Sequence, residues 1–243
     1  MEIVIVGAAM PFGPETMKHK SLGGSEAAQL QLGQELKKLG HSITQFTLLP
    51  DEGEPDHIPS GTTGPDGVRY VHIDHYATFI TSTECDLLIC ARNLELAHLG
   101  DQAKKKIFWM HDLATHGFAA QQIAGLGWCI DEIWCMSEFH KAQVHEVTGY
   151  PVANIRVLRN GCTDIDASDA GLLEPMQLVY AARPERGLIN LIRPGGIMEQ
   201  LPEYNLKVCM YANFPEHMQD FYNYCFARCK ELPNVELLGS LTN

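Results

Sequence analysis

The stretch LVYAARPERGL, residues 178–188, indicates how the chain is organised. Its apolar half predicts a buried strand, and Arg183 and Arg186 follow that strand. We expect Arg183 at the carboxyl end of the strand and Arg186 in the first turn of the next helix, where free backbone N–H groups attract anions. Two guanidinium groups placed in this way can hold both phosphates of a diphosphate. The alternative is a solvated helix start with Arg186 paired to Glu185 or Glu199.

The composition is that of an ordinary globular protein. The 243 residues are 45% hydrophobic and 8% aromatic, enough for one large domain or two modest ones. A net charge of −12 without any basic block predicts no nucleic-acid partner. The eight cysteines form no C-x-x-C pair, which favours reduced core thiols. We find no signal peptide and no transmembrane segment in the sequence, and we therefore expect a cytoplasmic protein.

Strand and helix patterns alternate through the first two thirds of the chain. Residues 2–6 are a β-branched run typical of a buried parallel strand, and residues 25–39 carry apolar side chains at helical spacing. Further strands are predicted at residues 42–49, 68–73, 86–90, 106–110, 132–136 and 152–158, and helices at 93–103 and 137–147. This alternation predicts an α/β fold with a parallel sheet and right-handed crossovers.

The loop before the first long helix contains the motif GGSE, residues 23–26. Gly23 and Gly24 would let a ligand approach the backbone closely, and the helix start behind them favours a polar or negative oxygen. The alternative is that the glycines only form the turn, while Ser25 caps the helix and Glu26 lies in its favourable first turn. The loop lacks the pattern G-x-G-x-x-G, so no dinucleotide cofactor is predicted.

The strand at residues 106–110 leads into His111 and Asp112, with His116 beyond them. Residues at the carboxyl ends of parallel strands face the binding crevice, so we expect a functional role for His111 and Asp112. The three side chains could instead bind a metal, but their spacing does not place them on a common face. Hydrogen bonding to a substrate is therefore favoured, and no metal is predicted.

The last third of the chain predicts a second, smaller α/β domain. The polar residues 164–175 are interpreted as a linker between domains at residues 1–163 and 176–243. After the strand of the opening stretch, we expect a helix to residue 200, a strand at 206–211, a helix at 215–231 and a strand at 235–238. Cys225 and Cys229 lie four residues apart on that helix and are expected to pack in the core.

In this order, the motifs resemble those of retaining glycosyltransferases of family 4. The segments YAARPERGL and INLIRPGGIMEQLPEYNLKV look like the opening of that family's second domain. GGSE resembles its first-loop motif, and WMHD resembles its W-x-H-D segment. NGCTD, residues 160–164, is close to its N-G-x-D signature but carries one extra residue. The resemblance implies the GT-B architecture of two Rossmann-like α/β domains with parallel sheets, the second of them incomplete.

The resemblance also implies roles for the basic and histidine residues. Arg183 and Arg186 would bind the donor diphosphate, and Gly187 would let the following helix start close to it. His111 would be the catalytic residue, near the donor sugar and the reacting centre, with Asp112 beside it. Arg186 replaces the commoner lysine of the family and keeps its charge.

Other site residues follow from the first loop and from the later strand ends. Gly23 and Gly24 would lie against the donor phosphate and the acceptor, together with Glu26. Ser137 follows a strand in the manner of the family, although a role as helix N-cap suffices to explain it. Asn160 belongs to the NGCTD segment and is a further candidate.

The implied activity is transfer of a sugar, with retention, from a nucleoside-diphosphate sugar between the domains to an unknown glycan, lipid or protein acceptor. No metal or other cofactor is expected. The family's second domain normally continues with further βα units and a pair of glutamates, which do not occur before Asn243, so we expect a truncated chain with little activity alone. The alternatives are a sugar-nucleotide epimerase or a phosphorylase of the same architecture, or a non-catalytic nucleotide-sugar-binding or interaction protein.

Overall fold

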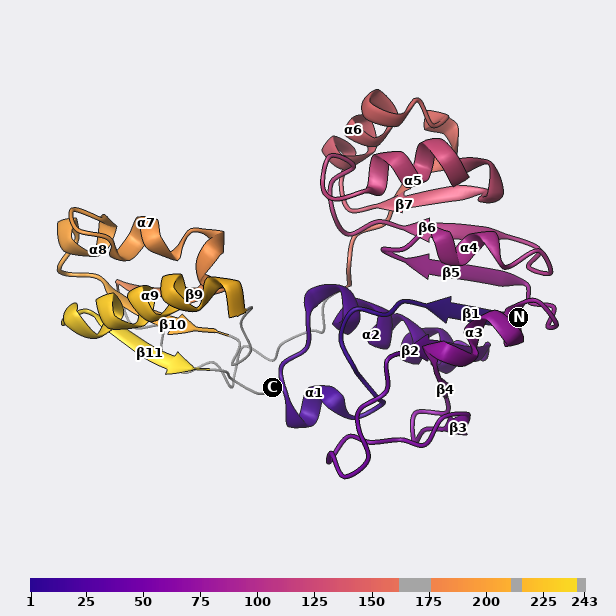
Figure 1. Ribbon diagram of the computed structural model, residues 1–243, viewed down its shortest axis with the longest axis horizontal. Helices are drawn as coiled ribbons and strands as arrows, with labels where there is room; N and C mark the ends of the chain where they lie inside the picture. Colours follow the sequence, from indigo (N-terminus) through magenta and orange to yellow (C-terminus); the bar gives the residue numbers. More distant parts are fainter. Residues whose placement is uncertain (162–175, 211–215, 240–243) are drawn as a thin grey trace. The chain divides into compact units, whose positions relative to one another are not determined.

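The chain forms two compact α/β units, Met1–Cys162 and Thr163–Asn243 (Figure 1). The computed structural model describes residues 1–161, 176–210 and 216–239. Both units are built on sheets of mainly parallel strands, so the predicted fold class is confirmed. The predicted linker, residues 164–175, and Asp164 of the NGCTD segment lie outside the described residues.

An eight-stranded sheet forms the centre of the first unit, here called unit 1. The order of its strands is β3-β4-β2-β1-β5-β6-β7-β8, and only the β3 and β4 pair is antiparallel. The central strand β1 is buried from its second residue onward, as a β-branched run between two helical layers should be. The strands are β1 Glu2–Val6, β2 Ser42–Thr47, β3 Thr62–Thr63, β4 Arg69–His72, β5 Leu87–Ala91, β6 Lys106–Trp109, β7 Glu132–Cys135 and β8 Ile155–Val157.

Helices cover both faces of this sheet. Val4 and Val6 of β1 pack with side chains of α3, α4, α5 and α6, whereas Ile3 and Ile5 pack with Leu30 of α2. Alternate residues of one strand therefore serve two separate cores. The helices are α1 Thr16–His19, α2 Gly24–Lys38, α3 Tyr76–Ile80, α4 Glu95–His98, α5 Ala119–Leu126 and α6 Glu138–Thr148, with 3-10 turns at Ile73–His75, Gly127–Cys129 and Val152–Asn154.

The prediction of a helix over residues 93–103 is wrong, because α4 covers only Glu95–His98. Gly100 follows the C-cap residue Leu99, and an added Cβ on this glycine would lie 2.4 Å from Cδ2 of Leu88. This close approach to β5 turns the backbone back toward the sheet before a longer helix can form. Glycine is the residue that permits such an approach.

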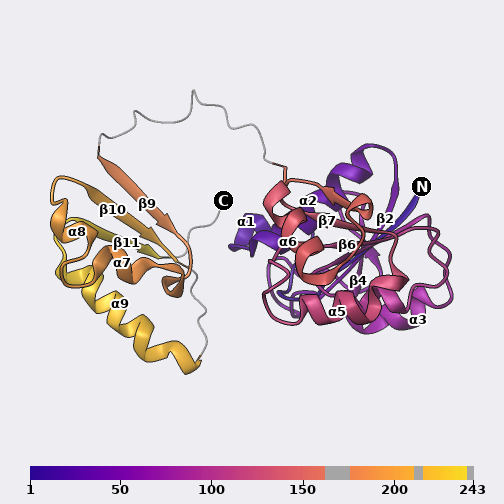
Figure 2. The same cartoon turned by 90° about the horizontal axis from the view of Figure 1, so that it is seen from above.

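A three-stranded parallel sheet, ordered β11-β10-β9, forms the second unit, here called unit 2. Figure 2 shows its helices along one face of the strands, where Leu206 and Val208 pack with Cys225 and Cys229. The predicted packing role of these cysteines is confirmed. The elements are β9 Gln177–Ala181, α7 Leu188–Ile192, α8 Ile197–Gln200, β10 Asn205–Cys209, α9 Gln219–Glu231 and β11 Val235–Gly239, with 3-10 turns at Pro184–Arg186 and Glu216–Met218.

The single helix predicted up to residue 200 is also wrong, because α7 and α8 are separate helices. Between them, Arg193 is extended, with ψ of 160°. Pro194 explains the break, since it lacks an N–H group and disfavours helical geometry at the residue before it. Predicted strand ends differ from the observed ends by one or two residues, except at the start of β8, where residues 152–154 of the predicted strand form a 3-10 turn.

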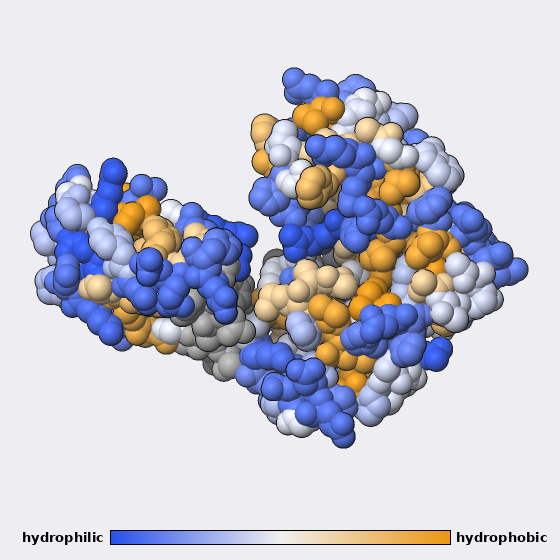
Figure 3. Space-filling model, viewed as in Figure 1, coloured by the Kyte–Doolittle hydropathy of each residue, from blue (hydrophilic) through white to orange (hydrophobic). Residues whose placement is uncertain are grey.

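The visible surface of both units is mainly hydrophilic, with apolar areas between the polar ones on unit 1 (Figure 3). Within the described ranges, no helix is both long and apolar enough to cross a membrane.

Replacing a buried leucine of β5 should show how far the stability of unit 1 depends on the core that contains it. Leu88 is fully buried, so Leu88→Ala should lower the free energy of unfolding by about 2–5 kcal/mol. Leu39 is 74% exposed, and Leu39→Ala is the matched control, with a change within about 0.5 kcal/mol. All three tryptophans lie in unit 1, so denaturant unfolding followed by their fluorescence measures this unit. Equal losses in both variants would contradict the packing described.

Candidate functional site

The candidate site of unit 1 lies where the order of the strands reverses. The chain runs from β1 to β2 on one side, and β5 returns to pair with β1 on its other side. Because β1, β5, β6 and β7 are parallel, the segments that follow them leave from the same edge of the sheet. In open α/β sheets, ligands bind at this edge, in the crevice beside the reversal.

The GGSE motif begins α2 at this edge, and its two glycines have different surroundings. A Cβ on Gly23 would lie 2.3 Å from Oε2 of Glu26, so a larger residue there would displace this buried carboxylate. A Cβ on Gly24 would meet no atom within 4 Å. Only Gly24 therefore has open space for a ligand. The proposed capping role of Ser25 is wrong, since the N-cap is Gly23, which has no side-chain cap.

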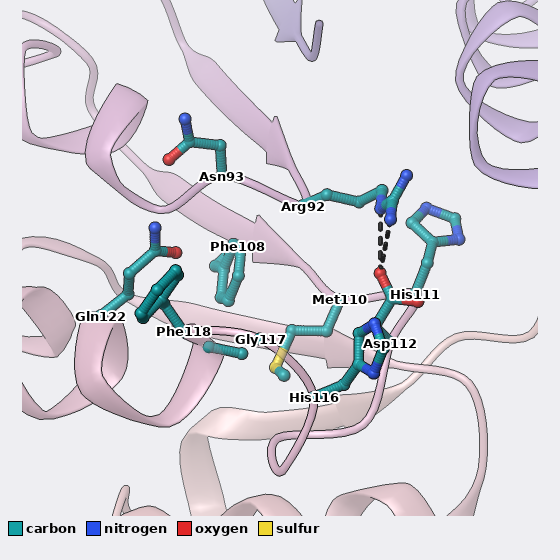
Figure 4. Close-up of a pocket in the computed structure, with 11 residues that line it drawn as sticks. Arg92, Asn93, Phe108, Met110, His111, Asp112, His116, Gly117, Phe118 and Gln122 are labelled. Atoms are coloured by element: carbon teal, nitrogen blue, oxygen red, sulfur yellow. Dashed lines mark hydrogen bonds and ion pairs between the residues drawn. The ribbon is translucent and has the colours of Figure 1, made fainter. Parts of the chain in front are cut away.

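Arg92 joins this helix start to the His111–Asp112 segment. Its Nη1 donates a hydrogen bond of 3.3 Å to Oγ of Ser25 and lies 3.7 Å from Oε1 of Glu26. On the other side, its Nε and Nη2 lie 2.9 Å and 2.8 Å from Oδ2 of Asp112 (Figure 4). The structure therefore brings together Gly23, Gly24, Glu26, His111 and Asp112, which the sequence separates by more than eighty residues.

His111 faces the α2 side of the sheet end. Its ring lies 4.5 Å from that of Trp109, two residues earlier, as the alternation of a strand dictates. Burial is the main cause that lowers the pKa of His111 to about 4, and the positive charge of Arg92, which also lowers it, outweighs the opposite effect of Asp112. The imidazole is therefore neutral at pH 7. Its buried Nε2 has no hydrogen-bond partner among the described residues, which is uncommon and points to a missing partner.

A pocket of about 320 Å³ opens beside Arg92 and Asp112, on the opposite side of the strand end (Figure 4). Phe118 stands at its rim, and its side chain is among the most exposed apolar groups of the chain. The side-chain oxygens of Asn93 and Gln122 accept backbone hydrogen bonds, from Glu95 and Leu94 respectively, so both amides are fixed in orientation. The pocket is lined by Arg92, Asn93, Phe108, Met110, His111, Asp112, His116, Gly117, Phe118, Ala119 and Gln122.

Ser137 and Asn160 lie at the ends of later strands. Oγ of Ser137 accepts a hydrogen bond of 3.1 Å from the backbone N–H of His140, so its capping role in α6 is confirmed. His140 itself is buried, and burial lowers its pKa. Asn160 lies exposed in the segment that follows β8, and no contact with the described residues assigns it a role.

The arginines of the opening stretch lie in unit 2, directly after β9. Arg186 belongs to the 3-10 turn Pro184–Arg186 rather than to the first turn of α7, which corrects the prediction. Gly187 follows with φ of 113°, a conformation that favours glycine, and it is the N-cap residue of α7. Backbone geometry therefore explains this glycine.

The two arginines differ in their partners. Nη1 of Arg183 lies 3.5 Å from Oε1 of Glu185, whose other oxygen accepts a hydrogen bond of 2.7 Å from the hydroxyl of Tyr222. Burial and this bond raise the pKa of Tyr222 to about 12, so the phenol remains a donor. Arg186 is exposed and forms no ion pair within the described part of the chain. Its alternative partners are engaged elsewhere, since Glu199 pairs with Arg228.

No group of three or more potential metal ligands is arranged to hold an ion within residues 1–161, 176–210 and 216–239. The three candidate ligands His111, Asp112 and His116 all line the pocket, and Asp112 is bound by Arg92.

Arg92 is the site residue that the sequence interpretation missed. It follows the apolar run LLICA of β5, so the rule that selected His111 after β6 also applied to it. A single arginine at a strand end does not form a recognisable motif. Its hydrogen bonds to Ser25, 67 residues earlier, and to Asp112, 20 residues later, could not be predicted from the sequence.

The depressed pKa of His111 should make stability depend on pH. The ordinary value is 6.5 and the folded value about 4, so between these pH values the unfolded chain binds a proton that the folded chain does not. The free energy of unfolding should therefore fall as the pH is lowered through this window. We expect His111→Gln to reduce that fall, and exposed His75→Gln to leave it unchanged.

The direct measurement is the NMR titration of the His111 ring, with an expected midpoint of about 4. A midpoint near 6.5 would mean that the ring is solvated and that the described surroundings of His111 are wrong.

Comparison with solved structures shows the fold of GT-B glycosyltransferases. Anabaena HepE in complex with UDP and glucose matches with a TM-score of 0.61 and 14% identity, over 98% of this chain and 68% of that one. Sucrose-phosphate synthase from Thermosynechococcus elongatus matches with a TM-score of 0.66 and 16% identity, over 99% and 71%. A glycosyltransferase from Rickettsia africae matches with a TM-score of 0.62 and 15% identity, over 99% and 68%.

No protein-family model matches the sequence, and no curated protein matches it. The chain spans between 68% and 71% of the length of the three structures. At these identities the likeness concerns the fold: the chain has the architecture of GT-B glycosyltransferases.

Proposed function

We propose that the chain belongs to a retaining glycosyltransferase that uses a nucleoside-diphosphate sugar. The observation that carries the proposal is the cluster of GGSE, Arg92 and His111–Asp112 at the strand reversal of unit 1. Solved structures of the same fold include HepE in complex with UDP-glucose. The motif resemblance to family 4 supports the retaining course.

In this proposal, Nε2 of His111 forms a hydrogen bond with the donor sugar. A neutral imidazole can exchange a hydrogen bond with a sugar hydroxyl without placing a charge beside the donor. Nε2 is buried and lacks a partner among the described residues, so a bound sugar hydroxyl would satisfy it. Gly24, with open space before its α carbon, lets the same sugar approach the start of α2.

We assign the pocket beside Arg92 to the acceptor. The polar groups that line it suit hydroxyl groups: the carboxylate of Asp112, the imidazole of His116 and the oriented amides of Asn93 and Gln122. Phe118 offers an apolar surface at the rim. A pocket that combines apolar walls with a few placed polar groups is typical of small-molecule sites. The glycan, lipid or protein that carries the accepting hydroxyl lies beyond the pocket.

In unit 2, the proposed task is to bind the leaving diphosphate. During transfer, the bond between the anomeric carbon and the diphosphate oxygen breaks, and the acceptor oxygen bonds to that carbon. The acceptor's proton passes to the departing diphosphate. Arg183 and Arg186 would stabilise the negative charge that develops on the diphosphate oxygens, with no metal required.

Removing either arginine should weaken the binding of a nucleoside diphosphate. We expect Arg183→Ala and Arg186→Ala each to lose about 1.5–3 kcal/mol of binding free energy, as for a charge-assisted hydrogen bond. Arg186→Ala should lose more, because the charge of Arg183 is already partly balanced by Glu185. Arg193 is also exposed in unit 2, and Arg193→Ala is the matched control. Titration calorimetry with UDP, GDP and ADP measures the effect, and unchanged affinity in both variants would refute the site.

The reaction itself is tested by incubating residues 1–243, and any longer form that the gene encodes, with UDP-, GDP- and ADP-sugars, with and without acceptor mixtures. We expect acceptor-dependent release of nucleoside diphosphate. His111→Asn should lower turnover by about 10²-fold while the unfolding midpoint stays near that of the unaltered chain. Conversion of the donor sugar without an acceptor would indicate an epimerase, and tight donor binding without turnover in any form would indicate a binding protein.

A further inference from the structure

We propose that Arg92 is a positioning residue that holds the start of α2 and the His111–Asp112 segment in one fixed arrangement. The inference rests on the proposed function for its effect on transfer. The role itself follows from the backbone and from the contacts of Arg92.

The backbone of Arg92 has an unfavourable conformation for its side chain. Its φ is +65°, in the left-handed region that residues other than glycine rarely adopt. The backbone N–H donates a hydrogen bond of 3.0 Å to the carbonyl of Trp109, which fixes this conformation to the end of β6. Strain of this kind persists where the surrounding structure requires it, and it is concentrated at functional sites.

The guanidinium connects two carboxylates from distant parts of the sequence. Glu26 has a side chain that is only 7% exposed, and Asp112 is 41% exposed. The planar guanidinium can contact both carboxylates and Oγ of Ser25 at once, because its N–H groups point in several fixed directions. The single ammonium group of a lysine cannot make all of these contacts together. Without Arg92, the buried carboxylate of Glu26 would lose its ion pair. Asp112 would also lose the side chain that connects it to the start of α2.

The same cation acts on His111. The charged and titratable groups that face this ring are Arg92 at the end of β5, Asp112 beside it and His140 from α6. Arg92 and His140 disfavour protonation of His111, and Asp112 favours it. Removal of the guanidinium would leave the influence of Asp112 unbalanced.

Two variants separate position from charge. Arg92→Lys keeps the positive charge but loses the fork, and Arg92→Asn loses both. Asparagine tolerates the left-handed backbone well, so Arg92→Asn should remain folded. Arg156→Asn is the matched control, because Arg156 is a 67% exposed arginine that forms an ion pair with Glu132, which begins β7 at its amino end.

We expect the NMR titration midpoint of His111 to rise toward 6.5 in Arg92→Asn and to stay low in Arg92→Lys. Turnover at saturating donor should fall by about 10²-fold in both variants, since a small misplacement of reacting groups suffices for such a loss. Arg156→Asn should change neither quantity.

An unchanged His111 midpoint in Arg92→Asn, or normal turnover in that variant, would overturn the proposal. Failure of the proposed function is distinguishable, because it would show as absence of transfer by the unaltered protein. The titration is made without any donor, so in that case the His111 midpoint in Arg92→Asn still decides whether the guanidinium lies close to His111 as described.

Discussion

The site of unit 1 depends on one constraint, which is the burial of β1 between two helical layers. Its odd-numbered and even-numbered residues supply different cores, and neither face can be exposed without losing one of them. Crossovers between parallel strands are right-handed, so helices can cover both faces only if the chain winds in both directions from β1, toward β2 on one side and toward β5 on the other. The crevice at the reversal is a consequence of that burial, and GGSE, Arg92 and His111 lie at its edge.

The sequence predicted this sheet well, because buried parallel strands have continuous apolar runs that are easy to recognise. Errors came where tertiary contacts overrule local pattern. Gly100 ends α4 early because Leu88 lies against it, and Pro194 divides the helix that was predicted as far as residue 200. The proline was visible in the sequence and should have predicted that break, whereas the contact of Gly100 was not visible.

Prediction of the site was uneven for a related reason. A motif identifies residues but does not give the contacts around them, so the sequence placed GGSE at a helix start without showing that Gly23 lies against Glu26. The structure shows that Gly23 makes room for the carboxylate of Glu26, and that only Gly24 faces open space. Arg92 has no motif, and its importance appears only when contacts across the sheet edge are known.

The charges of the two units are arranged in different ways. In unit 1, the carboxylates of Glu26 and Asp112 share one guanidinium and His111 is neutral, so this edge can accept uncharged hydroxyl groups without strong attraction for a phosphate. In unit 2, Arg186 stands exposed without an ion pair among the described residues, in a protein whose net charge is −12. A diphosphate approaching so acidic a protein gains little from long-range attraction. The proposed diphosphate binding would therefore depend on short, directed contacts, which the guanidinium group is the side chain best suited to make.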